Sequence, residues 1–262
     1  MRVSDRGNGE VDTARVEVAR NEHIMVVTMV RTAKRNAVDQ EMTTALDAAM
    51  NELDDDPTVR VGILTGGIDM FCAGTDMAKT SGTPTKRGGV YGLVGRTRVK
   101  PLIAAVEGIA FGGGCEIAMA CDMVVAASTA RFALPEVKRG LVASSGALFR
   151  AARVLPLNIA KQMLTTGQDL SAERAYQLGF VNQVTEPGGA LAGAMEIAEQ
   201  LAANAPLAAQ HALRVVEHLA SASDEEGWDL SADAQRQNMQ TNDSREGVQA
   251  FFERRAPTWT AS

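Results

Sequence analysis

The sequence predicts an α/β fold whose C-terminal third is helical. Short apolar runs at residues 59–65 and 102–106 alternate with segments of helical spacing, a pattern typical of strands that pack against helices. After Ser144 the helical pattern continues with few interruptions. With 262 residues, 45% of them hydrophobic, the chain can bury a sizeable core. We expect a core of residues 1–195 and a helical region of residues 196–262.

The N-terminal part alternates strands and helices. Residues 14–20 alternate apolar and polar side chains, and residues 23–30 are rich in β-branched ones, so both are expected to be strands. Asp39 is expected to cap the helix that follows. After the strand at residues 59–65, residues 66–89 are rich in Gly, Thr and Lys. We expect a long loop there, and loops of that length are usually functional or mobile.

A glycine run separates the next two predicted strands. Residues 102–106 and 123–127 are the strands, and a helix is expected to begin at the glycine run between them. Ser171 is expected to cap a helix that Gly179 ends, and a short strand at residues 180–184 follows. The remaining chain is predicted to be helical in three segments, residues 190–203, 206–221 and 225–240.

Composition narrows the classes of function. The formal net charge of −6 argues against general binding to nucleic acid or to anionic membranes. Residues 1–15 lack the apolar core of a signal peptide, and no later stretch is apolar for long enough to span a bilayer. We therefore expect a cytoplasmic protein with free thiols at its three cysteines. With three histidines in the chain, a zinc site is not expected.

The run Gly112-Gly113-Gly114-Cys115-Glu116 carries the strongest chemical signal. A glycine run at a strand-to-helix junction leaves backbone amides exposed at the helix N-terminus, where they can hold an anion. Glu116 lies one helical turn after Gly113, so its carboxylate is expected to lean back toward the same amides. The spacing fits neither GxGxxG nor the P-loop motif. A tight packing site that needs small residues is the alternative interpretation.

Two further elements of the sequence indicate chemistry when they are considered together with the glycine run. The turn Phe71-Cys72-Ala73-Gly74-Thr75-Asp76 offers a second backbone amide, and two amides aimed at one point form an oxyanion hole. Glu136 follows Pro135 and an apolar run, and a second carboxylate opposite Glu116 would make a pair for acid–base chemistry. Taken alone, Asp76 could simply cap a helix and Glu136 could lie in a plain surface turn.

These three elements, in this order, make the chain resemble the crotonase (enoyl-CoA hydratase/isomerase) superfamily. The resemblance covers nearly the whole chain, and the F-x-A-G-x-D turn and the G-G-G-x-E run are its most specific parts. Gly179-Phe180-Val181-Asn182 adds to it. The resemblance implies a spiral of repeated ββα units with a helical C-terminal region. It also implies a homotrimer or a dimer of trimers.

The resemblance also implies acyl-CoA thioester substrates and assigns chemical roles. The amides of Ala73 and Gly113 would hold the thioester oxygen and stabilise its enolate, and Glu116 and Glu136 match the two glutamates of the hydratases. One glutamate activates water for attack on the β-carbon, and together they manage the proton delivered to the α-carbon. The implied activity is that of an enoyl-CoA hydratase, a lyase of fatty acid or other lipid metabolism that adds water syn to a trans-2-enoyl-CoA. Hydration transfers no electrons, so neither a metal nor a separate cofactor is implied, and coenzyme A belongs to the substrate.

Contacts with the CoA portion are carried over from the same resemblance. The candidates come from the segment after the second strand, from the F-x-A-G-x-D turn and from the last helix. They are Lys34, Arg35, Gly74, Thr75, Asp76, Phe251 and Arg254, with Arg255 as the alternative to Arg254. From the residues alone, each basic side chain is equally consistent with a solvated surface charge.

One departure from the hydratases keeps alternatives open. Many hydratases have a Pro-Gly pair where this chain has Ala143-Ser144, and an amide of that stretch helps to hold the water. The alternatives are a double-bond isomerase, another acyl-CoA lyase of the superfamily, and a non-catalytic acyl-CoA binder that needs neither carboxylate. A hydrolase with Cys115 as nucleophile would need a histidine, and His211 and His218 lie far along the chain.

Overall fold

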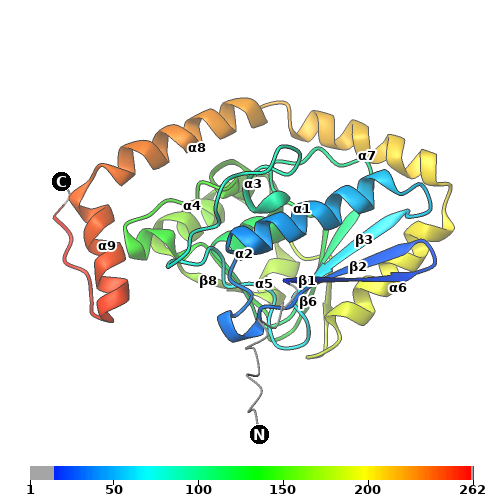
Figure 1. The fold of residues 1–262 in the computed structure, drawn as a ribbon, viewed down its shortest axis with the longest axis horizontal. Coiled ribbons are helices and arrows are strands. Elements are labelled where there is room, and N and C mark those ends of the chain that lie inside the picture. Colours follow the sequence, from blue (N-terminus) through cyan, green and yellow to red (C-terminus); the bar gives the residue numbers. More distant parts are fainter. Residues whose placement is uncertain (1–14, 261) are drawn as a thin grey trace, which may run out of the picture.

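A six-stranded sheet forms the centre of the computed structural model, which describes residues 15–260 and 262 (Figure 1). The interpretation of residues 1–15 as a polar segment without a signal peptide therefore lies outside the described residues, except for Arg15. The strand order is β1-β2-β3-β4-β6-β9; β1 and β2 pair antiparallel and the other neighbours pair parallel. The strands are β1 (Val16–Asn21), β2 (Ile24–Met29), β3 (Val61–Thr65), β4 (Leu102–Val106), β6 (Met123–Ala127) and β9 (Gln183–Thr185).

A second, three-stranded sheet lies beside the first in the order β5-β7-β8. Its strands are β5 (Ile109–Phe111), β7 (Arg131–Ala133) and β8 (Asp169–Ser171). Consecutive strands β4 and β5 are followed by a helix, as are β6 and β7, and each pair gives one strand to each sheet. Cys72 forms a parallel bridge with Ala110 that adds an earlier segment to the small sheet. This arrangement confirms the predicted spiral of ββα units.

Helices surround the sheets and make up most of the C-terminal part of the described chain (Figure 1). The α-helices are α1 (Gln40–Asp55), α2 (Gly113–Met119), α3 (Ala147–Val154), α4 (Leu157–Thr166), α5 (Ala172–Gln177), α6 (Ala190–Ala203), α7 (Pro206–Ala220), α8 (Asp224–Met239) and α9 (Asn242–Glu253). Short 3-10 helices are η1 (Thr32–Lys34), η2 (Val90–Gly92) and η3 (Pro135–Arg139).

Both faces of the large sheet are buried at its inner strands β3 and β4. Alternate residues of a strand point to opposite faces, so Leu64 packs in the same core as Leu46 of α1, whereas Ile63 and Ile103 pack with Ala194 of α6. This explains the continuous apolar runs of β3 and β4, because parallel strands covered by helices on both sides carry apolar residues at every position.

The predicted helix caps are confirmed. Asp39 accepts a hydrogen bond from the Met42 amide at 3.0 Å, and Ser171 accepts one from the Arg174 amide at 3.2 Å. The strand predicted at residues 180–184 is wrong in its position. The amides of residues 180 and 181 bond to the carbonyl of Ala175 and so continue the end of α5, and the strand begins at residue 183.

The helices after residue 205 form an arm that crosses the molecule. In Figure 1, α7 and α8 arc over the body and α9 descends at the far side, close to η3. A side chain at Gly247 would collide with the Arg139 carbonyl, so this glycine lets α9 approach η3 closely. The predicted boundary between residues 195 and 196 falls inside α6, whose Ala190, Ala194 and Ala198 pack on the large sheet. Among the described residues, no helix is both long and apolar enough to cross a membrane.

Candidate active site

A cavity of about 1340 Å³ lies between the spiral core and the C-terminal arm. Its walls come from the segment after β2, the turn at residues 73–76, η2, the start of α2, η3 and the helices α8 and α9. Glu116 and Glu136, which are 20 residues apart in the sequence, both line it. The fold therefore brings the glycine run, the F-x-A-G-x-D turn and both glutamates to one cavity.

The carboxyl group of Glu116 is fixed inside this cavity. Glu116 is 2% exposed, and its Oε1 accepts a hydrogen bond from the Ala147 amide at 3.1 Å. Ala147 is the first residue of α3, where amides have no partner within the helix. The carboxyl group is thus bonded to the start of α3 and to Ser145 just before it, rather than to the amides of the glycine run.

The carboxyl group of Glu136 is held less tightly. Its Oε2 is buried and has no hydrogen-bond partner among the described residues. Its Oε1 lies 3.0 Å from the point that a Cβ of Gly112 would occupy, and Gly112 has a φ of 54°. The positive φ and the short distance both favour glycine at position 112. Because Gly112 immediately precedes α2, the short distance also shows that Glu136 lies beside the start of that helix.

The environment of the two carboxyl groups favours their neutral forms. Burial raises the pKa of Glu116 to about 8, the nearby charge of Glu136 raises it further, and hydrogen bonds from Ala147 and Ser145 lower it. Burial also raises the pKa of Glu136 to about 7. Near neutral pH the pair therefore holds both a protonated and an ionised carboxyl, which is what paired acid–base chemistry requires.

Backbone amides of two segments meet next to these carboxyls. A Cβ at Gly74 would lie 2.9 Å from the Gly113 nitrogen, so the turn touches the start of α2. The Ala73 amide, which the sequence assigned to the oxyanion hole, donates to the Arg35 carbonyl at 3.0 Å. That assignment is corrected: among the described residues the Thr75 amide has no hydrogen-bond acceptor, so it is the donor left beside Gly113.

Asp76 has a structural role in the turn. Its carboxylate pairs with Arg31 at 2.8 Å and accepts the amides of Ala78 and Lys79 at 2.9 and 3.2 Å. Arg31 is itself buried and also pairs with Asp39 at 3.1 Å. This network ties the turn to the N-terminus of α1 and so fixes the amides.

The residues expected to contact CoA divide into two groups. Lys34, Arg35 and Phe251 line the cavity, as do the turn residues 74–76. Arg254 is not part of its wall; it lies at the C-terminal cap of α9 with a φ of 56°. Arg245 of α9 lines the cavity instead. The expectation that Arg254 or Arg255 contacts CoA stays a prediction, and Arg245 is a further candidate on the same helix.

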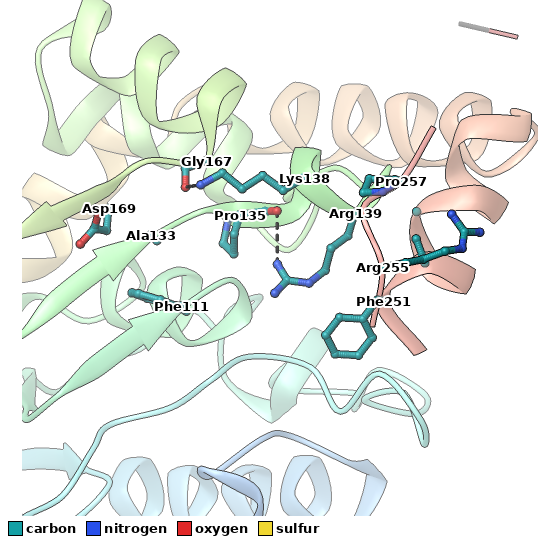
Figure 2. A pocket seen from close by; sticks show the side chains of 12 residues that line it. Phe111, Ala133, Pro135, Lys138, Arg139, Gly167, Asp169, Phe251, Arg255 and Pro257 are labelled. Carbon is teal, nitrogen blue, oxygen red and sulfur yellow. Dashed lines mark hydrogen bonds between the residues drawn. The ribbon is translucent and has the colours of Figure 1, made fainter. Parts of the chain in front are cut away.

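A second cavity of about 550 Å³ adjoins the first and is shown in Figure 2. The guanidinium group of Arg139 lies 5.2 Å from the centre of the Phe251 ring, and both residues line the two cavities. Arg255, the alternative to Arg254, lines this second cavity, but Glu246 and Glu253 already bind its guanidinium group at 2.5 and 2.6 Å.

The arrangement does not suit a cysteine hydrolase. Cys115 is fully buried, and burial together with the two glutamates raises the pKa of its thiol well above the usual value. A neutral thiol is a poor nucleophile. His211 and His218 are exposed on α7, so neither is placed as its base.

Tyr91 is a cavity residue that was not singled out from the sequence. Tyr91 lies in a glycine-rich segment without helical or strand periodicity, and the structure buries it beside Glu116 and Gly113. The sequence offers one indication of its role: Tyr91 stands between Gly88-Gly89 and Gly92. A large aromatic residue is unusual among the glycines of a tight turn, so its presence indicates a specific contact.

Comparisons with known proteins agree with this geometry. The sequence profile of the family described as enoyl-CoA hydratase/isomerase matches residues 19–262. An enoyl-CoA hydratase from Mycobacterium tuberculosis is 36% identical over 92% of this chain and 95% of that protein. A carnitinyl-CoA dehydratase from Salmonella typhi is 38% identical over 93% of this chain and 97% of that protein. The crystal structure of a carnitinyl-CoA hydratase from Mycobacterium avium has a TM-score of 0.91 at 34% identity, covering 95% of this chain and all of that one (100%).

Proposed function

This chain belongs to the enoyl-CoA hydratase/isomerase family of the crotonase superfamily, and we propose that it adds water to the double bond of a trans-2-enoyl-CoA thioester. The observation that carries the proposal is the presence in one cavity of two glutamates with raised pKa values, of which Glu116 is buried and Glu136 has one buried carboxyl oxygen. A non-catalytic binder of acyl-CoA would need neither carboxyl.

The protons balance with one carboxylate and one carboxylic acid. As the water oxygen bonds to the β-carbon, the carboxylate takes a proton from the water. The carboxylic acid gives its proton to the α-carbon, so the pair as a whole keeps one proton. Delivery of both groups from one cavity supports syn addition, and each positioned acid or base contributes ~10²- to 10⁴-fold to the rate.

The negative charge that develops on the thioester oxygen is assigned to two amides, those of Thr75 and Gly113. Such donors are fixed before the reaction, so they stabilise the enolate without reorganising. We place the CoA portion toward Lys34, Arg35 and Phe251. The reaction needs neither a metal nor a separate cofactor, because hydration changes no oxidation state overall.

We also propose that the chain assembles into a homotrimer or a dimer of trimers. Large apolar side chains of α7 are more than half exposed in the single chain: Leu207, Val215, Val216 and Leu219. Light scattering on the eluting protein measures the mass of the assembly. A monomer at micromolar concentration would contradict the proposal.

Dehydration of a carnitinyl-CoA is the second candidate. One relative is named carnitinyl-CoA dehydratase and another carnitinyl-CoA hydratase, and dehydration is the same chemistry run toward loss of water. Its substrate carries a quaternary ammonium group. Aromatic rings attract such cations, and Tyr91 and Trp228 line the cavity together with the two glutamates.

The test is the loss of enoyl-thioester absorbance over a substrate panel. The panel holds trans-2-enoyl-CoAs with short, long and ring-bearing acyl groups, together with a crotonyl thioester that carries a trimethylammonium group. The Glu116→Gln/Glu136→Gln double variant is the matched control, because each amide keeps the shape of the carboxyl that it replaces.

Turnover that disappears in the control supports a hydratase and reveals its acyl preference. A strong preference for the cationic thioester favours the carnitinyl substrate. Saturable binding of CoA esters without turnover of any of them contradicts the hydratase proposal and favours an isomerase or a binder.

A further inference from the structure

Tyr91 is a buried residue that the proposed chemistry does not use. It is 3% exposed and lines the main cavity together with Glu116 and Glu136. Its φ of 56° places a bulky residue in the left-handed region, which is unfavourable for any residue other than glycine. A Cβ on Gly113 would collide with its hydroxyl group. The surrounding structure therefore holds this ring at the reacting centre in spite of the backbone strain.

The segment around η2 is anchored to α1 by partly buried polar contacts. The Thr85 hydroxyl donates to Asp47 at 2.7 Å, and Arg96 pairs with Asp47 at 2.7 Å and with Asp54 at 2.9 Å. The Arg96 side chain is 1% exposed, so these ion pairs are protected from water. This anchoring gives the phenol of Tyr91 a fixed position.

The phenol joins two hydroxyl groups that come from different walls of the cavity. Its oxygen lies 2.8 Å from Thr75 Oγ1, and Ser145 Oγ donates to it at 3.2 Å. Hydrogen bonding from the backbone and side chain of Ser145 also lowers the pKa of Glu116. Glu116, Ser145, Tyr91 and Thr75 thus follow one another along the cavity wall, from the acid–base group to the turn of the oxyanion hole.

The number of hydroxyl protons limits the hydrogen bonds that Ser145, Tyr91 and Thr75 can make at one time. Three hydroxyl groups carry three protons, and the two links between them use two. The third proton is available at one end of the row. When Glu116 is ionised, Ser145 can donate to its carboxylate; when Glu116 is protonated, Ser145 donates to Tyr91 instead.

We propose that Ser145 and Tyr91 form a hydroxyl chain that sets the orientation and protonation of Glu116, with Tyr91 as a positioning residue. The proposal rests on the acid–base role assigned to Glu116 above. Tyr91 acts by competing for the Ser145 proton: each hydrogen bond that Ser145 gives to the phenol is one that it does not give to the carboxylate.

Other charged or titratable groups face Glu116 from the elements packed around it. They are Glu136 of η3, Cys115 of α2 and Arg150 of α3. Burial and the two glutamates raise the pKa of Tyr91 far above its usual range, so the phenol stays neutral while they titrate. Tyr91 is therefore a hydrogen-bond partner and not a base.

The first test needs no turnover. The chain has two tyrosines, so labelling with ¹³C at the ring carbon that bears the hydroxyl gives two resonances. Tyr176 lies half exposed on α5, and the Tyr176→Phe variant assigns the signals. We expect the Tyr91 resonance to shift with pH with a midpoint near 8, and the shift to disappear in Glu116→Gln. The proposal is overturned if the Tyr91 resonance does not shift with pH, or if it shifts in the same way in Glu116→Gln.

The second test uses the pH profile of kcat on the thioester that turns over. In Tyr91→Phe, Ser145 no longer donates to a phenol and can donate to the Glu116 carboxylate. The part of the pH profile that reports the ionisation of Glu116 therefore moves to lower pH. In Ser145→Ala the carboxylate loses that donor and this part of the profile moves to higher pH. We expect kcat of Ser145→Ala to fall about 10-fold, the cost of a lost hydrogen bond to a charged group, while KM of both variants stays within about 2-fold.

The double variant distinguishes a hydroxyl chain, in which Tyr91 acts through Ser145, from two residues that influence Glu116 independently. Because Tyr91 acts through Ser145, Tyr91→Phe/Ser145→Ala should have the pH profile of Ser145→Ala alone, and Tyr176→Phe should behave as the wild type. Shifts in the same direction, or additive shifts, contradict the chain. If no thioester is hydrated, the proposed function fails while the resonance of Tyr91 still tests the hydroxyl chain.

Discussion

The two sides of the active-site cavity are built differently. The inner wall, formed by η2, α2 and the start of α3, fixes Glu116 through the Ala147 amide and anchors its neighbour Tyr91 through ion pairs to α1. The outer wall, formed by η3 and α9, carries the half-exposed ring of Phe251 and Glu136, whose Oε2 finds no hydrogen-bond partner in the part of the chain that the structure describes. The inner wall thus orients Glu116, and the outer wall, which carries the more exposed side chains, is the one that the proposed function assigns to the CoA portion of the substrate.

The largest expected effect tests whether both walls contribute to the chemistry. Glu116→Gln and Glu136→Gln should each lower kcat by ~10²- to 10⁴-fold, because each removes one partner of the proton exchange. Steady-state kinetics on a hydrated thioester measures this. A large loss from Glu116→Gln with none from Glu136→Gln would mean that the outer wall only binds and that a single carboxyl carries the chemistry.

The second prediction concerns stability at high pH. The pKa of Glu116 rises from 4.5 to about 8 on folding, so the folded protein binds this proton more tightly than the unfolded chain does. The free energy of unfolding therefore falls as pH rises above 4.5 and levels off above about 8. Glu116→Gln removes this penalty and should stabilise the protein by on the order of 1–3 kcal/mol at pH 9.

Denaturant unfolding of wild type and Glu116→Gln at pH 5 and pH 9 measures this difference. At pH 5 the two proteins should have nearly equal stability, because the folded wild type is then protonated at this position. Equal stability at both pH values would show that Glu116 is not held in its neutral form. The same comparison for Glu136→Gln should give a smaller gain, since its pKa rises only to about 7.

A smaller effect is expected at the outer wall. Phe251→Ala removes the ring that packs on Arg139 and lines both cavities. We expect KM to rise about 3- to 10-fold with kcat within about 2-fold, because the lost contact acts on binding and not on the reacting atoms. Inhibition by free CoA should weaken in parallel. A fall in kcat with unchanged KM would move Phe251 to the reacting centre.

The smallest effect distinguishes two neighbouring arginines of the arm. Arg254→Ala should leave KM for the thioester within about 2-fold of the wild type, because this side chain is not part of the cavity wall. Arg245→Ala should raise KM, and the two variants make the same change of charge. If Arg254→Ala weakens binding more than Arg245→Ala does, the assignment made from the sequence was the better one.

The sequence was sufficient for the layers of the fold and for the identity of the two glutamates. Strands β3 and β4 are mainly apolar and buried at every position, and Asp39 marks a helix start by its chemistry alone. The strands β5, β7 and β8 were not predicted as such. Each has three residues, too few to establish a period of two, and long-range pairing decides their conformation.

The detailed roles of the site residues could not be predicted from the sequence, because they depend on contacts between segments that are far apart in the chain. The F-x-A-G-x-D turn could be recognised, but only the bond between the Ala73 amide and the Arg35 carbonyl leaves Thr75 as the free donor. The choice between Arg245 and Arg254 depends on where α9 ends and which face it turns to the cavity. Tyr91 depends on the folding of a loop, where side-chain spacing carries no information.

The close approach of α9 to η3 has a consequence for the order in which the enzyme is completed during translation. The ribosome makes the strands, the glycine run and Glu136 well before it makes Gly247, whose missing side chain lets α9 dock. A nascent chain can thus assemble both sheets while one wall of its substrate cavity has yet to be synthesised. Activity should consequently appear later in synthesis than protease resistance of the spiral core.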